Sequence, residues 1–299
     1  MRLTRGLIFV LLAGLVAGLV AGCQPRSYTD DAGRTVEIGT VPHRIVSFGP
    51  SITETLFALG LDDSIVGVTD FCDYPEAARD KAKVGNSFVP SIEKVVELEP
   101  DLVLTVEHEQ FIRELEALDI TYVVLDPEDL DSILDTILLA GEVTGRAKEA
   151  KRLVDEMESV IRDITNRVEG AARPRVFFMV DATNPNMPWT TGGQSFIHDV
   201  ITMAGGQNIA SRVTDDYAQL SIEEIVSADP DVIIVQTMAG GVPTVSAEVL
   251  EKHPVWGEMS AVRAGDVYFA NGDLVSRPGP RIVQGLEEVA RILHPEAFD

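Results

Sequence analysis

The sequence predicts an α/β fold in which two Rossmann-like lobes are joined by one long backbone helix. First, strand patterns alternate with helix patterns in both halves of the 299-residue chain, as in parallel α/β sheets. Second, a helical periodicity separates the two halves. Third, residues 91–104 (SIEKVVELEPDLVL) and 221–234 (SIEEIVSADPDVII) match at a constant offset of 130 residues. The same helix–turn–strand segment therefore occupies an equivalent place in each lobe.

The N-terminus has the pattern of an export signal. It reads MRLTRGLIFVLLAGLVAGLVAGC, with two arginines, an uncharged apolar run, and small residues before Cys23. Its last residues, VAGC, resemble the lipobox of bacterial-type lipoproteins. Residues 1–22 are therefore predicted to be a lipoprotein signal peptide, with Cys23 as the lipidated first residue of the mature chain. The alternative is an uncleaved membrane anchor, and in either case the remainder lies outside the cytoplasm, held at a membrane.

The charge of the chain argues against a nucleic-acid partner. The formal net charge is −24, and the signal segment contains Arg2 and Arg5 but no acid, so its removal makes the chain more negative still. Binding to nucleic acid requires basic surface that displaces counterions. The excess of acid suits a protein that works in the open and is kept soluble by its own charge. Hydrophobic residues make up 45% of the chain, enough for a substantial core.

The segment after the signal leads into the first lobe. Residues 23–42 are polar and contain Gly and Pro, so they are predicted to form a tether and a short hairpin. The N-terminal lobe is expected over 43–140, beginning with a buried strand and a helix in which Ser51 and Glu54 fit a capping box. The remaining strands of this lobe are expected at 64–70, 102–106 and 121–126, with helices from Ser91 and over 109–119.

The linking helix is expected over 141–170. Apolar residues step by three and four through this segment, at Val143, Ala147, Ala150, Val154, Met157, Ile161, Ile164 and Val168. Sustained spacing of this kind is also compatible with a coiled coil, but an α/β unit on each side favours a bar between two lobes.

The C-terminal lobe is expected over 171–299, where the alternation resumes. Strands are predicted at 175–181, 231–237 and 266–272, and helices over 195–206, after Ser221 and from Pro280.

Aromatic side chains gather in the loops that follow the predicted strands. Two lobes that face each other form a cleft, and ligands bind near the carboxyl ends of parallel strands. These loops contain Phe71, Tyr74, Phe88, Trp189 and Tyr217, together with Asp273 and Arg277. Each aromatic residue alone could be an ordinary loop anchor. Together they predict an aromatic pocket with an acid and a base at its rim, suited to a large planar ligand.

Catalytic motifs are weak or absent in the sequence. Ser91 and Lys94 fit the S-x-x-K pattern, but no S-D-N or K-T-G accompanies them, and Ser91 is better explained as a helix N-cap. With Cys23 lipidated, Cys72 has no disulfide partner and is interpreted as a packed residue. Metal ligands can converge from distant loops. A zinc or manganese site from His108, His198 and Asp273, in a metal receptor or a metal-dependent hydrolase, therefore stays open as an alternative.

Two glutamates occupy matching positions in the duplicated segment. Glu93 and Glu223 each lie in the first turn of a predicted helix, where a carboxylate complements the helix dipole. That role does not explain why each lobe presents one. Two carboxylates at equivalent places on rigid lobes would suit docking onto a two-fold partner with basic sockets.

Several stretches resemble a known family. RIVSFGPSITETLFALG, GVTDFCDYPEAA, PSIEKVVELEPDLVL and GDLVSRPGPRIVQGLEEVARILHPE are similar to the iron-siderophore and vitamin B12 class of substrate-binding proteins of ABC importers. The similarity covers residues 28–298 and implies a class III periplasmic binding protein fold with a helical backbone. DFCDYPEAA is closest to the vitamin B12-binding branch, where an aromatic residue, one further residue and then Asp-Tyr-Pro are typical.

The resemblance assigns roles to individual residues. Phe71 matches an aromatic residue that the branch places against the corrin, and Tyr217 matches a tryptophan of the cleft. Asp273 and Arg277 match an acid and an arginine beside the ligand. The glutamates at 93 and 223 match the pair that docks onto arginines of the permease dimer. Two departures stand out: the branch has a tryptophan where this chain has Ser87, with Phe88 next to it, and DLVSRPG lacks the aromatic residues that can follow the Asp.

The predicted function is that of an extracytoplasmic, lipid-anchored substrate-binding protein of an ABC importer, with no enzymatic activity and no cofactor. It would capture cobalamin or another corrinoid between its lobes and deliver it, as a monomer, to a permease dimer with its ATPase. The alternative within the class is a ferric siderophore or haem. Because one stiff helix joins the lobes, the cleft is expected to be largely preformed.

Overall fold

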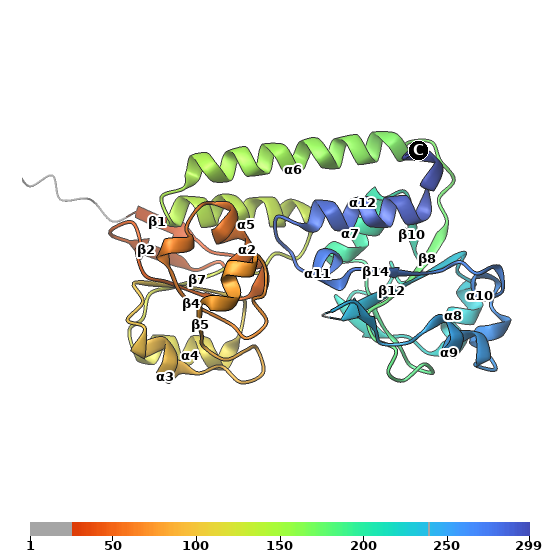
Figure 1. Ribbon diagram of the computed structural model, residues 1–299, viewed down its shortest axis with the longest axis horizontal. Helices are drawn as coiled ribbons and strands as arrows, with labels where there is room; N and C mark the ends of the chain where they lie inside the picture. Colours follow the sequence, from red (N-terminus) through yellow and green to blue (C-terminus); the bar gives the residue numbers. More distant parts are fainter. Residues whose placement is uncertain (1–25, 239) are drawn as a thin grey trace, which may run out of the picture.

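Two α/β lobes lie side by side beneath one long helix, α6 (Ala147–Val168), which runs along both of them (Figure 1). This arrangement is seen in a computed structural model, which describes residues 26–238 and 240–299. The predicted signal peptide and Cys23 lie outside the described residues. Within the described ranges, no helix is long and apolar enough to cross a membrane.

The N-terminal lobe is built on a five-stranded parallel sheet with the order β5-β4-β3-β6-β7. Its strands are β3 (Ile45–Phe48), β4 (Ile65–Val68), β5 (Ala82–Lys83), β6 (Leu102–Thr105) and β7 (Tyr122–Val124). Its helices are α2 (Pro50–Ala58), α3 (Ile92–Glu97), α4 (Glu109–Ala117) and α5 (Leu130–Val143), with 3-10 turns η1 (Asp62–Ser64) and η2 (Glu76–Asp80). The segment expected to form a hairpin contains β1 (Arg26–Thr29), which pairs antiparallel with β2 (Thr35–Ile38).

The C-terminal lobe repeats this plan. Its sheet has the order β10-β8-β12-β14 with parallel neighbours, and β13 adds to β12 antiparallel. Its strands are β8 (Arg175–Met179), β10 (Gln207–Asn208), β12 (Val232–Met238), β13 (Val242–Pro243) and β14 (Val267–Ala270), and a separate ribbon pairs β9 (Trp189–Thr191) with β11 (Tyr217–Gln219). Its helices are α7 (Phe196–Met203), α8 (Ile222–Ala228), α9 (Ala247–Lys252), α10 (Ser260–Ala264), α11 (Gly272–Val275) and α12 (Ile282–Leu293), with 3-10 turns η3 (Trp256–Glu258) and η4 (Pro295–Ala297).

One hydrophobic core runs through both lobes. Buried side chains of α5, α6, α7 and α12 form a single cluster with residues from both sheets, from Ile45 of β3 to Val176 of β8. The other face of each sheet has its own core, under α3 and α4 in the N-terminal lobe and under α8 to α10 in the C-terminal lobe. Since the shared helical layer is packed against both sheets, a large change in the angle between the lobes would have to break that core.

The linking helix differs from the expectation in its starting point. The apolar pattern predicted one helix from Val143 onwards, but Val143 ends α5, and the chain reverses before α6 begins at Ala147. Gly145 makes the turn with φ of 73°, a backbone conformation that favours glycine. Ala147 itself is exposed. The periodicity looked unbroken because the short turn preserves the four-residue step while the helix direction changes.

The two helices of this hairpin approach closely at a glycine. A Cβ atom added at Gly141 would lie 2.3 Å from the Cβ atom of Ala150. Small residues at 141 and 150 therefore set the distance between α5 and α6. Along α6 the buried stripe consists of Ala150, Val154, Met157, Ile164 and Val168.

Candidate functional site

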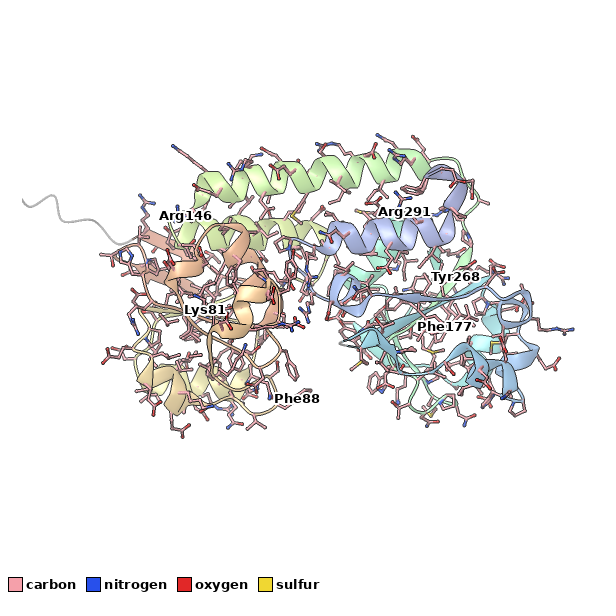
Figure 2. The ribbon with its side chains drawn as sticks, viewed as in Figure 1. Lys81, Phe88, Arg146, Phe177, Tyr268 and Arg291 are labelled. Carbon is pink, nitrogen blue, oxygen red and sulfur yellow. The ribbon has the colours of Figure 1, made fainter. Side chains whose placement is uncertain are left out.

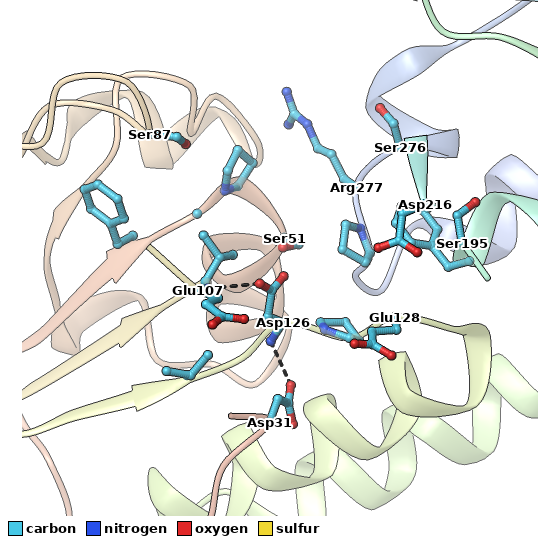
Figure 3. Close-up of a pocket in the computed structure, with 18 of the residues that line it drawn as sticks. Asp31, Ser51, Ser87, Glu107, Asp126, Glu128, Ser195, Asp216, Ser276 and Arg277 are labelled. Carbon is cyan, nitrogen blue, oxygen red and sulfur yellow. Dashed lines mark hydrogen bonds between the residues drawn. The ribbon is translucent and has the colours of Figure 1, made fainter. Parts of the chain in front are cut away.

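A cleft of about 470 Å³ lies between the lobes (Figure 3). The N-terminal lobe contributes the segments that follow β3, β6 and β7, where parallel strands end. The C-terminal lobe contributes the start of α7, the start of β11 and the turn before α12. The cleft thus opens at the carboxyl ends of the N-terminal sheet, the usual position for a ligand in an open parallel sheet.

The charged side chains of the cleft are almost all acidic. Its wall contains five carboxylates and one guanidinium, the latter from Arg277. The acids are Asp31, Glu107, Asp126, Glu128 and Asp216. Four of them come from the N-terminal lobe, and Asp216 faces them from the other lobe (Figure 3).

Hydrogen bonds hold the acids of the N-terminal lobe in place. The Asp31 carboxylate accepts hydrogen bonds from the backbone N–H of Asp126 at 2.7 Å and from the Thr136 hydroxyl at 2.8 Å. The Asp126 carboxylate in turn accepts one from the backbone N–H of Glu107 at 2.9 Å. The chain of contacts fixes the acids at the ends of β6 and β7.

The crowding of these carboxylates changes their acidity. Loss of hydration raises the pKa of Asp126, and the neighbouring charges of Glu107, Asp31 and Glu128 add to this rise, while the Glu107 N–H opposes it. Loss of hydration likewise raises the pKa of Asp31, against the Thr136 and Asp126 hydrogen bonds. Both acids would be stabilised by a positive charge or by hydrogen-bond donors on a ligand.

The one arginine of the cleft is already paired. The Arg277 guanidinium lies 2.6 Å from Asp273, 2.8 Å from Asp73 and 3.0 Å from Glu54. Burial acts to lower the pKa of Arg277, but hydrogen bonds to Asp73 and Glu54 outweigh it and the pKa is raised. Burial would raise the pKa of Asp73, yet the hydrogen bond and charge of Arg277 lower it. The guanidinium points away from the acids at 31 and 126 (Figure 3).

Glu54 joins the two lobes through a second arginine. Its carboxylate receives two hydrogen bonds from Arg281, at 2.7 and 2.6 Å, besides the one from Arg277. The Glu54 side chain is only 2% exposed, and the Arg281 guanidinium also lies 3.9 Å from the ring centroid of Tyr74. The expected capping box of Ser51 and Glu54 is therefore wrong. Helix α2 begins at Pro50 without a side-chain cap, and Glu54 serves a tertiary contact instead.

The predicted ligand residues fall into two groups. Tyr217 and Arg277 line the cleft. Phe71 and Phe88 contact each other edge to face, with ring centroids 6.4 Å apart. Phe88 is 85% exposed, at the edge of the N-terminal lobe that faces the other lobe (Figure 2). Asp273 and the 43%-exposed Trp189 are not among the residues of the cleft wall, and Asp273 meets it only through Arg277.

The residues of the alternative metal site have other contacts. The described residues contain no group of three or more His, Cys, Asp or Glu placed to hold a metal ion. His108 caps α4, accepting from the Phe111 N–H, and its other ring nitrogen lies 3.0 Å from the Ser87 carbonyl oxygen. Cys72 is buried, and its sulfur lies 3.1 and 3.0 Å from the hydroxyls of Thr53 and Thr69. These contacts agree with the interpretation of Cys72 as a packed residue.

The paired glutamates are exposed on helices of different lobes. Glu93 lies in the first turn of α3 and Glu223 in the first turn of α8. Ser221 caps α8 in a capping box with Glu224. Ser91 stands at the N-cap position of α3 without a side-chain cap, its hydroxyl lying 3.4 Å from the Glu93 carboxylate. Both helices lie on the side of the molecule away from α6 (Figure 1).

The acids of the cleft were missed in the sequence. Glu107 and Asp126 directly follow strands, in TVEHE and VLDPED, and this position was a usable signal. Only aromatic residues had been sought there. Asp31 carried no such signal, because it follows the N-terminal hairpin strand β1 and reaches the cleft only through the fold.

Comparison with known proteins gives a consistent match. The family described as periplasmic binding protein matches residues 45–274. The chain is 34% identical over 282 residues to the uncharacterized ABC transporter substrate-binding lipoprotein YvrC of Bacillus subtilis, covering 92% of this chain and 87% of that protein. It is 30% identical over 279 residues to a cobalamin-binding protein of Halobacterium salinarum, covering 90% and 74%. A solved periplasmic haem-binding protein, BhuT, aligns at 25% identity with a TM-score of 0.76, covering 85% and 98%.

Proposed function

Because the chain belongs to the periplasmic binding protein family, we propose that it captures a corrinoid between its lobes and delivers it to the permease of an ABC importer. At the coarser level, it is an extracytoplasmic substrate-binding protein of an ABC importer, of the class whose members bind vitamin B12, siderophores or haem. The choice of a corrinoid rests on the charge of the cleft.

The acidic wall is the observation that carries this choice. Haem has two propionates, and many ferric catecholate and carboxylate chelates are anions, so each would bring like charge against five carboxylates. Like charges brought together across an interface cost several kcal/mol. A corrinoid instead presents a ring of primary amide side chains, each with two N–H donors, around a cationic metal. Carboxylates accept such hydrogen bonds, whereas Arg277 already has three carboxylate partners.

The aromatic side chains would cover the faces of the macrocycle. Phe71, Phe88, Trp189 and Tyr217 are large apolar groups left 43% to 85% exposed in the described chain. Burial of this surface against a flat ligand is favourable by about 25 cal/mol per Å². Exposed aromatic residues around an acidic cleft thus fit a ligand with apolar faces and an amide-rich edge.

The proposal includes the route of delivery. Cys23 would carry a lipid that holds the protein at a membrane, and Glu93 and Glu223 would dock onto basic sockets of a two-fold permease with its ATPase. Support comes from the exposure of both glutamates at equivalent places in the two lobes. Unchanged corrinoid uptake by a Glu93→Ala and Glu223→Ala variant that still binds ligand would refute the docking role.

A ligand titration tests the corrinoid. The chain from Gln24 onwards is titrated separately with cyanocobalamin, a ferric hydroxamate, a ferric catecholate and haemin, by calorimetry and tryptophan fluorescence. Trp189 is exposed at the rim and Trp256 is fully buried, so Trp189→Phe identifies a signal that arises at the cleft. We expect one-to-one binding of the corrinoid alone. Tight binding of an iron chelate, with none of cyanocobalamin, would overturn the ligand and leave the importer role intact.

A charge variant separates the acidic wall from the rest of the site. Glu107→Gln with Glu128→Gln removes two charges from the cleft, and Asp62→Asn with Asp63→Asn removes two from an exposed turn elsewhere on the same lobe. Corrinoid affinity should fall in the cleft variant, haemin affinity should rise, and the control should leave both unchanged. Equal effects of the two pairs would show that only the overall charge matters.

A further inference from the structure

The duplicated segment is a structural repeat that extends beyond its glutamates. At the offset of 130 residues, β3 and its neighbour β6 correspond to β8 and its neighbour β12, and each pair is parallel. Helix α3 corresponds to α8. Each helix is followed by an acid at positive φ, Glu99 at 44° and Asp229 at 42°. The two helices therefore enter and leave their lobes with the same backbone geometry.

A matching arginine and aspartate hold each of these helices. In the N-terminal lobe, Arg44 donates side-chain hydrogen bonds to the carbonyls of Leu98 and Glu99, and Asp101 accepts from the Arg44 N–H. In the C-terminal lobe, Arg175 donates to the Ala228 carbonyl and to Asp231, and Asp231 accepts from the Arg175 N–H at 2.8 Å. The last turn of each helix is thus attached to the start of the neighbouring strand.

Each helix presents a valine beside its glutamate. Val96 follows Glu93 by three residues and Val226 follows Glu223 by three, so each pair shares one helix face. The exposed fractions are 46% for Val96 and 43% for Val226. The residues just before them, Val95 and Ile225, are completely buried and fix the rotation of the helices. The repeat has therefore kept an exposed apolar residue at the same distance from the acid on both lobes.

We infer that each docking surface has two parts, a carboxylate and a valine, and that the importer meets them with two symmetry-related sockets, each a cation flanked by an apolar patch. This inference rests on the proposed docking to a permease and adds its apolar component. The carboxylate guides and orients the encounter, and salt screens its contribution. The valine contributes burial that salt does not screen. Two copies of one surface on two lobes require a partner with two-fold symmetry.

The expected size of the effect follows from the burial of one side chain. Burial of an exposed valine is equivalent to about a tenfold gain in affinity, and two independent sites give roughly a hundredfold. Replacement by threonine keeps the branched shape and adds a hydroxyl that would have to be desolvated. A Val96→Thr and Val226→Thr variant should therefore bind the permease about a hundredfold more weakly.

The test measures binding of the mature lipoprotein to the permease–ATPase complex with which it restores corrinoid-dependent growth, reconstituted in nanodiscs. The valine pair is compared with the Glu93→Ala and Glu223→Ala pair, and with Val160→Thr plus Val249→Thr, two exposed valines outside the repeat. Cyanocobalamin titration and thermal unfolding of each variant show whether the cleft and the fold are intact.

The expected result is weaker permease binding for the valine pair at both low and high salt, with the control pair unchanged. The glutamate pair should matter most at low salt. If only the glutamate pair weakens binding, the apolar part of the surface is refuted and the proposed docking stands. If neither pair weakens binding, the docking role fails together with this inference.

Discussion

The buried carboxylate of Glu54 should be among the most sensitive side chains for stability. Its substitution by glutamine keeps the size and places an NH₂ group where the wild-type oxygen accepts from arginine N–H groups. Glu54 lies in α2 and its partners precede α12, so the contact connects the two lobes. Loss of the charge leaves positive groups uncompensated in a site with little water.

The magnitude follows from what each arginine retains. Arg277 keeps Asp73 and Asp273, at 2.8 and 2.6 Å. Arg281 loses its carboxylate partner and keeps only a 3.4 Å contact with the Asp273 carbonyl and the ring of Tyr74. Removal of one partner from a buried ion pair costs about 3–5 kcal/mol. With one of the two arginines left uncompensated, we expect the lower end, about 3 kcal/mol, which corresponds to a fall in Tm of roughly 6–12 °C.

The assay is equilibrium unfolding in urea, followed by circular dichroism, with a thermal scan in parallel. Arg281→Met in the Glu54→Gln background should recover part of the loss, with a coupling of about 2 kcal/mol. Glu158→Gln breaks an exposed pair with Arg162 on α6 and should cost under about 0.5 kcal/mol. A Glu54→Gln variant as stable as this control would refute the structural role assigned to the network.

Two further predictions concern the cleft acids and the helix hairpin. Because the folded pKa of Asp126 is raised, its ionised form opposes folding, so Asp126→Asn should raise the free energy of unfolding at neutral pH, and the gain should shrink as pH falls through the folded pKa. Asp129 is the reverse case: hydrogen bonds from Ser132 lower its pKa, so Asp129→Asn should destabilise at neutral pH, and urea titrations at several pH values would detect equal signs if the reasoning is wrong. Gly141→Ala should destabilise by about 1–3 kcal/mol through the close approach of Ala150, although alanine favours a helix, while Gly39→Ala meets nothing within 4 Å and serves as the control in the same Tm measurement.

The importer class could be reached from the sequence because its signals are local or repeated. Strand and helix periods report how each segment buries its apolar side, and the constant offset between Glu93 and Glu223 reports a duplicated unit. The long helix was predicted from the same period. Its first turn was misplaced because the turn at Gly145 leaves the apolar spacing intact.

The sequence by itself determined the fold class, the two-lobed plan and the positions of the paired glutamates, since these depend on contacts between near neighbours or on repetition. Only the tertiary structure decided how charges meet across the lobes. Glu54 and Arg281 are 227 residues apart, and no spacing along the chain indicates that they pair. The acidic wall arises in the same way, because Asp31, Asp126 and Asp216 converge on one cavity from segments far apart in sequence. Electrostatic interactions depend on distance in space and on local hydration, and both are set only when the lobes are packed together.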